Sequence, residues 1–115
     1  MIPVVKNTNQ ILQEIDKLHF FEAIEKQLNK DFNFSGIIYQ FQSNSPHKLV
    51  EDLRLQLHQL ITSNFSSYLN LLYRIDVSEA EIKNITEVDI NEIIEHATFL
   101  ILKREFQKVW FKSKF

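Results

Sequence analysis

Histidines that have an acidic residue three or four positions away come closest to a chemical motif in this chain. Asp16 and Glu22 stand three positions on either side of His19, and Glu92 precedes His96 by four. On a helix, each pair shares one face and could offer two ligands to a metal ion. Bundles that hold two metals use a Glu-x-x-His pair on each of two helices. The sequence contains no such pair, so we interpret these residues as local ion pairs.

Other reaction chemistry is not recognisable in the sequence. The chain has no cysteine, which removes thiol catalysis, disulfides and thiolate metal sites together. It has neither a glycine-rich phosphate loop nor the spacing of a serine-centred triad. We therefore predict no catalytic residue, no cofactor and no metal ligand, and an enzyme is the least favoured class.

Basic residues gather near the end of the chain. Residues 103–115 carry five bases against one acid, whereas residues 76–95 carry seven acids against one base. The basic, aromatic segment suits an anionic polymer or membrane surface. Acids at helix starts and a base-rich helix end also complement the helix dipole, and we favour this simpler interpretation because the net charge is only −2. The candidate anion-binding residues are Lys103, Arg104, Lys108 and Lys112.

A scarcity of turn-forming residues indicates which elements carry these side chains. The 115 residues include one Gly and two Pro, which favours a few long elements over many short ones. Apolar residues recur at helical spacing, so these elements should be helices. We find no internal repeat or linker. The sequence predicts a single all-α domain over residues 1–115, a bundle of three long helices and one short one.

The segment from Pro46 to Asp76 is the predicted central helix. Ser45 can cap it, and Pro46 suits the first helical position. Two apolar stripes lie on roughly opposite sides, so we expect neighbouring helices on both flanks. Asn64 falls within the main stripe. We favour a kink or a close helix contact there over a ligand cavity or a contact that determines the oligomeric state.

An irregular crossover should precede the central helix. Thr8 or Asn9 can cap a first helix that runs to about Asp31, with a bend or short break near His19 and Phe20. The strand-like run over 37–41 has no second strand to pair with inside the chain. We therefore interpret it as an extended crossover lying across the bundle, with pairing to its copy in a second subunit as the less favoured alternative. Tyr39 and Phe41 would then plug an end of the core.

Capping signals predict the remaining helices. Ser78 and Glu81 have the spacing of a capping box, which predicts a short helix over about 79–84. A looser copy of this pattern at Thr86 predicts that the last helix begins near Glu87. Between Ala97 and Leu102 this helix is apolar on nearly every side, so that section should be the most buried.

Apolar residues that the core of one chain does not need suggest a surface for association. Trp110, Phe111 and Phe115 stand at a helix end that would normally fray, so either residues 2–5 or a second subunit should cover them. The second stripe of the central helix likewise favours a homodimer. The candidate interaction residues are Leu55, Phe65, Leu69, Tyr73, Phe106, Val109 and Trp110.

These patterns favour a small, non-enzymatic, self-associating interaction module, with an unidentified protein as a further partner. Binding of nucleic acid or an anionic surface through the basic end is the alternative. We see no secretory signal, and polar residues interrupt the longest uncharged helical run. We therefore expect a cytoplasmic chain with no membrane span.

Overall fold

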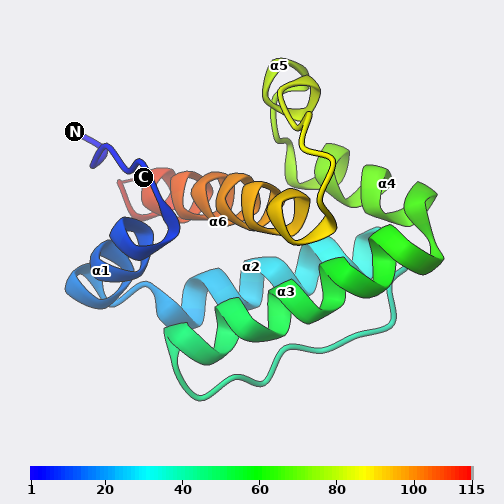
Figure 1. Ribbon diagram of the computed structural model, residues 1–115. Helices are drawn as coiled ribbons and strands as arrows, with labels where there is room; N and C mark the ends of the chain where they lie inside the picture. Colours follow the sequence, from blue (N-terminus) through cyan, green and yellow to red (C-terminus); the bar gives the residue numbers. More distant parts are fainter. Residues whose placement is uncertain (115) are drawn as a thin grey trace.

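The protein is a bundle of helices arranged around its last one. The computed structural model describes residues 1–114, and this part of the chain forms six helices. The last, α6 (Ile90–Lys114), is the orange-to-red helix that crosses the middle of Figure 1. It packs most extensively against four others, and short α5 (Glu79–Lys83) precedes it. These four are α1 (Thr8–Leu18), α2 (Phe21–Phe34), α3 (Pro46–Ser63) and α4 (Phe65–Ile75).

The central position of α6 follows from its all-round apolar composition. Between Ala97 and Leu102 only Phe99 is not fully buried, as the sequence predicted. A helix that is apolar on every side loses most by exposure to water, so it takes the middle of the bundle. The segment that begins at Pro46 does not hold that place within the chain, because its outer residues Leu55 and Tyr73 are 61% and 58% exposed.

The predicted break near His19 is confirmed and separates α1 from α2. The cap of α1 is Asn7 rather than Thr8 or Asn9, because the Asn7 side chain accepts a hydrogen bond from the Gln10 N–H. His19 then adopts a left-handed conformation, with φ 58° and ψ 43°, and ends the helix. The chain turns there, and α2 continues to Phe34, slightly beyond the predicted end.

The crossover over residues 35–45 is also confirmed. Its second residue is Gly36, whose φ of 76° is natural for a residue without a Cβ. The side chain of Asn29 anchors it, because Oδ1 accepts from the Phe41 N–H at 2.6 Å and Nδ2 donates to the Phe41 carbonyl at 3.2 Å. Phe41 is 1% exposed and packs edge-on against Phe32 at 4.9 Å between ring centroids. The extended segment thus runs alongside α2 and places Phe41 in the core (Figure 1).

The predicted central helix is in fact two helices that meet at Asn64. The Asn64 N–H donates to the Leu60 carbonyl and ends α3, while its side chain accepts from the Ser67 N–H and starts α4. Asn64 is exposed to solvent, so it lines no buried cavity. The predicted kink therefore lies at the right residue, but the helix ends there and a new one begins instead of one helix bending.

Capping residues determine where the last two helices begin. Ser78 caps α5 by accepting from the Glu81 N–H at 3.2 Å, as the capping box predicted. For α6 the cap is Asp89, whose carboxylate accepts from the Glu92 N–H at 3.2 Å. The helix therefore begins at Ile90 and not near Glu87, because Asp89 rather than Thr86 supplies the acceptor. Within residues 1–114, no helix has the length and apolarity needed to cross a bilayer.

Candidate functional site

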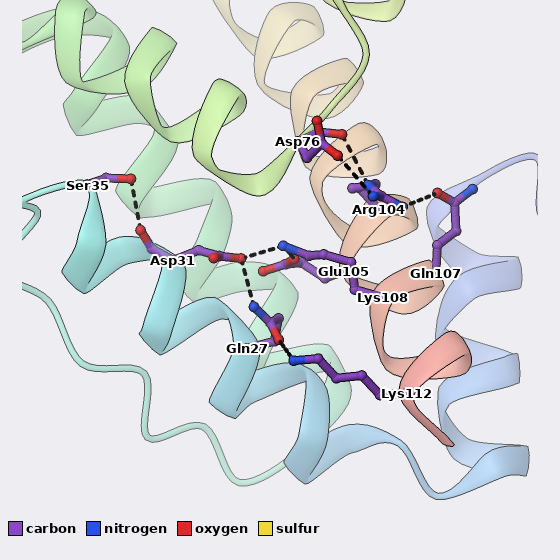
Figure 2. Close-up of polar contacts among 9 residues, drawn as sticks. All are labelled: Gln27, Asp31, Ser35, Asp76, Arg104, Glu105, Gln107, Lys108 and Lys112. Carbon is purple, nitrogen blue, oxygen red and sulfur yellow. Dashed lines mark hydrogen bonds and ion pairs between the residues drawn. The ribbon is translucent and has the colours of Figure 1, made fainter. Parts of the chain in front are cut away.

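A buried cluster of two carboxyl groups and one ammonium group lies between α2 and α6. Asp31 on α2 is 4% exposed, and Glu105 on α6 is fully buried. Lys108, one turn after Glu105, reaches both: its Nζ lies 2.7 Å from Asp31 Oδ2 and 2.6 Å from Glu105 Oε1. Figure 2 shows these three side chains meeting between the two helices. Charged groups with so little access to water are uncommon outside ion pairs and functional sites.

The cluster holds a proton because one lysine faces two carboxyl groups. Burial, and then the neighbouring Asp31 carboxylate, raise the pKa of Glu105 to about 9, while Lys108 opposes the shift. At neutral pH the Lys108 ammonium therefore pairs with the Asp31 carboxylate, and Glu105 stays protonated. The Glu105 oxygens have no hydrogen bond of good geometry among the described residues. Hydrogen bonding therefore offsets little of the free-energy cost of burying this carboxyl group.

The cluster continues outward to the surface through Gln27. The Gln27 amide donates to Asp31 Oδ2 at 3.3 Å, and its carbonyl oxygen accepts from Lys112 Nζ at 2.8 Å. Gln27 is 8% exposed, so both ends of its amide are satisfied inside the protein. A continuous polar chain thus runs from Glu105 through Lys108, Asp31 and Gln27 to Lys112 (Figure 2).

A groove of about 520 Å³ lies where this chain reaches the surface. Helix α2 and the residue before it contribute one wall, and the end of α6 contributes the other. Its volume falls within the range of small-molecule sites. The lining residues are Phe20, Ala23, Lys26, Gln27, Lys30, Val109, Lys112 and Ser113.

A second, more polar cleft of about 630 Å³ lies between the start of α1 and the first turns of α6. His96 Nδ1 lies 2.8 Å from Glu87 Oε2, and Arg54 pairs with Glu95 at 2.6 Å. Hydrogen bonds from its own backbone N–H and from His96 hold the pKa of the Glu87 carboxyl below its usual range. All four side chains line the cleft. Two pairs of opposite charge within the cleft, His96 with Glu87 and Arg54 with Glu95, are thus formed by the chain itself.

The histidine pairs seen in the sequence do not form a metal site. His96 bonds Glu87 and not Glu92, because the chain before α6 folds back onto the helix. Among residues 1–114, no three side chains of metal-binding type lie close enough together to hold an ion.

All four predicted anion-binding residues bond groups of the same chain. Lys103 bonds Glu81 at 3.2 Å, and Arg104 bonds Asp76 at 3.1 Å. Lys108 lies in the buried cluster, and Lys112 donates to Gln27. The charge asymmetry of the sequence therefore reflects contacts between the basic half of α6 and the acids that surround it.

The predicted interaction residues fall into two groups. Leu55, Phe65 and Tyr73 are 61%, 53% and 58% exposed, and Leu69 is partly buried against the core. Phe106 and Val109 are instead core residues, at 0% and 6% exposure, so they offer little surface to a protein partner on the folded chain. Phe106 was misjudged because α6 buries several of its sides, and Phe20 packs on its ring at 5.9 Å.

The end of α6 remains partly uncovered. Trp110 is partly buried and carries Lys114 Nζ 4.4 Å above its ring, while Phe111 is 49% exposed. Residues 2–5 lie against α6 near Lys103 and Phe106, one to two turns before Trp110. The predicted cover for Phe115 concerns a position outside the described residues.

Sequence reasoning missed the Asp31–Glu105–Lys108 cluster, although one signal was present. Glu105 follows Ile101 by four positions and precedes Val109 by four, so a charged residue stands within an apolar stripe. Such a position predicts a buried carboxyl group that needs a partner. Asp31, which lies on another helix, could not be identified as that partner from spacing alone.

The sequence matches no protein-family model, no curated protein resembles it, and no solved structure matches its fold.

Proposed function

We propose that this protein is a small, non-enzymatic interaction module that associates with itself through the outer face of α4. The observation that carries the proposal is a stripe formed by Phe65, Leu69 and Tyr73, which are spaced by four residues. Two of the three side chains are more than half exposed. Exposed apolar residues that form a contiguous row are typical of a contact surface, whereas single ones are ordinary.

The surroundings of the stripe favour an apolar partner. Arg74 is the single charged residue of α4, so covering this helix removes few charges from water. The Arg74 guanidinium lies 5.1 Å from the ring centre of Phe34, which is 56% exposed at the end of α2. Phe34 thus adds a fourth large apolar side chain beside α4.

A second copy of the chain suits this stripe because the row is self-complementary. In an antiparallel pair of α4 helices, Leu69 lies at the twofold axis and Phe65 of one copy meets Tyr73 of the other. A helix of 11 residues is about 16 Å long, so the pair buries less than a standard interface of about 1,200–2,000 Å². We therefore expect a dissociation constant of about micromolar size.

Leu55 is not part of this surface. Its neighbours on the same side of α3 are the exposed polar residues Glu51, His58 and Gln59, so it stands alone among polar groups. This isolation makes Leu55 a suitable control position.

Light scattering after size-exclusion chromatography tests the proposal. At about 100 µM, well above a micromolar dissociation constant, the native chain should have twice its mass of 13.7 kDa. Tyr73→Glu should return the mass to that of one chain, while the matched variant Leu55→Glu should keep the doubled mass. A native mass of 13.7 kDa at this concentration would refute self-association, and loss of the dimer in both variants would refute its placement on α4.

Binding of nucleic acid through the basic end of α6 remains the alternative function, and no contact favours it. Lys103, Arg104 and Lys108 are paired with acids of the same chain, so few charges are left to neutralise phosphates. We place the module in the cytoplasm, a location supported by the absence of cysteine.

A further inference from the structure

The groove between α2 and α6 combines positive charge on its rim with apolar side chains on its walls. Lys26 and Lys30 stand one turn apart on α2, and Lys112 faces them from α6. No acidic residue lines the groove. Across residues 1–114, neither Lys26 nor Lys30 forms an ion pair. The three ammonium groups therefore repel one another, and an anion between them would relieve that repulsion.

Lys112 is held in place by the buried cluster. Its Nζ donates to Gln27 Oε1 at 2.8 Å, and the Gln27 amide is in turn fixed by Asp31. Asp31 accepts from Lys108 at 2.7 Å in the interior. Because this chain of contacts restrains Lys112 before any ligand arrives, less side-chain entropy is lost when an anion binds.

The apolar walls are also formed in advance. Val109 is 6% exposed, and the ring of Phe20 rests against Phe106 at 5.9 Å, so both are fixed by the core. Ala23 also lines the groove, and its side chain, a single methyl group, takes up little of the space. A ligand with an apolar part can therefore use this surface without a rearrangement of the protein.

We propose that this groove binds a small amphiphilic anion, whose carboxylate or phosphate group lies among Lys26, Lys30 and Lys112 and whose short apolar chain lies against Phe20, Ala23 and Val109. A nucleic-acid strand fits less well, because the other bases of α6 are paired and the positive rim is confined to the groove. The groove shares no residue with the α4 stripe, so this site is independent of self-association.

Calorimetric titration with four probes tests the chemistry of the site. At least one of octanoate and octyl phosphate should bind, at one site per chain. The probe that binds with the higher affinity identifies the preferred head group. Inorganic phosphate alone and octyltrimethylammonium should bind at least about tenfold more weakly. Equal binding of the cationic probe would refute the role of the lysines, and equal binding of inorganic phosphate would refute the role of the apolar walls.

A pair of double variants locates the site. Lys26→Gln with Lys30→Gln should weaken binding of the better anion by at least about tenfold, because two of the three charges are removed. Lys17→Gln with Lys114→Gln removes the same charge from residues outside the groove and should leave the affinity unchanged. All four lysines are exposed: Lys17 lies on α1, Lys26 and Lys30 lie on α2, and Lys114 lies at the end of α6. Both double variants should therefore fold. Equal affinities of the two double variants would overturn the proposal.

Discussion

A hydrogen bond of 2.7 Å from Lys108 Nζ to Asp31 Oδ2 joins residues that lie 77 positions apart and ties α6 to α2. The same ammonium group lies 2.6 Å from Glu105 Oε1. One positive charge thus serves two carboxyl groups inside the protein. Because the two carboxyl groups share one ammonium group, the stability of the fold should depend on pH and on Lys108.

Glu105→Gln should remove a pH dependence of stability. Burial raises the pKa of Glu105 to about 9 in the folded chain, above its ordinary value of 4.5. Between these values the folded state binds a proton that the unfolded state has lost, so the free energy of unfolding falls as pH rises, by at most about 1.4 kcal/mol per pH unit. Urea unfolding from pH 5 to 9 should show a shallower decline in the variant. Parallel curves for the two proteins would contradict the assignment.

Lys108→Met should destabilise the fold by about 3–5 kcal/mol at pH 7, because it leaves the buried Asp31 carboxylate without a counter-charge. Lys103→Met is the matched control. Its partner Glu81 is 37% exposed, so this change should cost no more than about 1 kcal/mol. Denaturant unfolding of both variants measures the difference. A similar loss in the two would show that Asp31 and Lys108 form no special pair.

His19→Gly should stabilise the protein by about 1 kcal/mol, because His19 is exposed and has a φ of 58° that a residue with a Cβ adopts at a cost. Lys17→Gly, two positions earlier within α1, should instead destabilise it by roughly 0.5–1 kcal/mol. Thermal unfolding of both variants provides the comparison. The account of the α1–α2 break would fail if the two substitutions acted in the same direction.

The carboxyl group of Glu87 should titrate below its usual range, since its own backbone N–H and His96 both favour the charged form. His96→Gln should raise the pKa of Glu87 only in part, because the backbone contact remains. Carbon NMR of the side-chain carboxyl group across an acid titration measures both values. A Glu87 that titrates identically in the two proteins would show that the His96 contact is absent in solution.

Local signals in the sequence predicted much of the fold. The capping box at Ser78, the break near His19 and the crossover that carries Phe41 each depend on neighbouring residues, and all three are found. The predicted start of α6 was too early. Thr86 and Asp89 could each act as the cap, and Asp89 is the residue that does so.

Features that depend on distant residues were not predictable in this way. The stripes over residues 46–76 were assigned to one unbroken helix, but the chain breaks at Asn64 into α3 and α4. The buried cluster likewise needs the packing of α2 against α6, which no spacing within either helix reveals. The polar cleft at His96 was missed because Glu87 lies outside the helix that carries the histidine.

Self-association through α4 is tested most directly by a distance between two copies of the chain. The sequence has no cysteine, so Asn70→Cys provides a single attachment point for a spin label on an exposed position of α4. Packed helices lie about 8–10 Å apart, so labels on paired α4 helices should give one well-defined intermolecular distance by pulsed electron paramagnetic resonance. That distance should disappear when Tyr73→Glu is added. A sample at about 100 µM that shows no intermolecular coupling, or coupling that persists with Tyr73→Glu, would contradict the account.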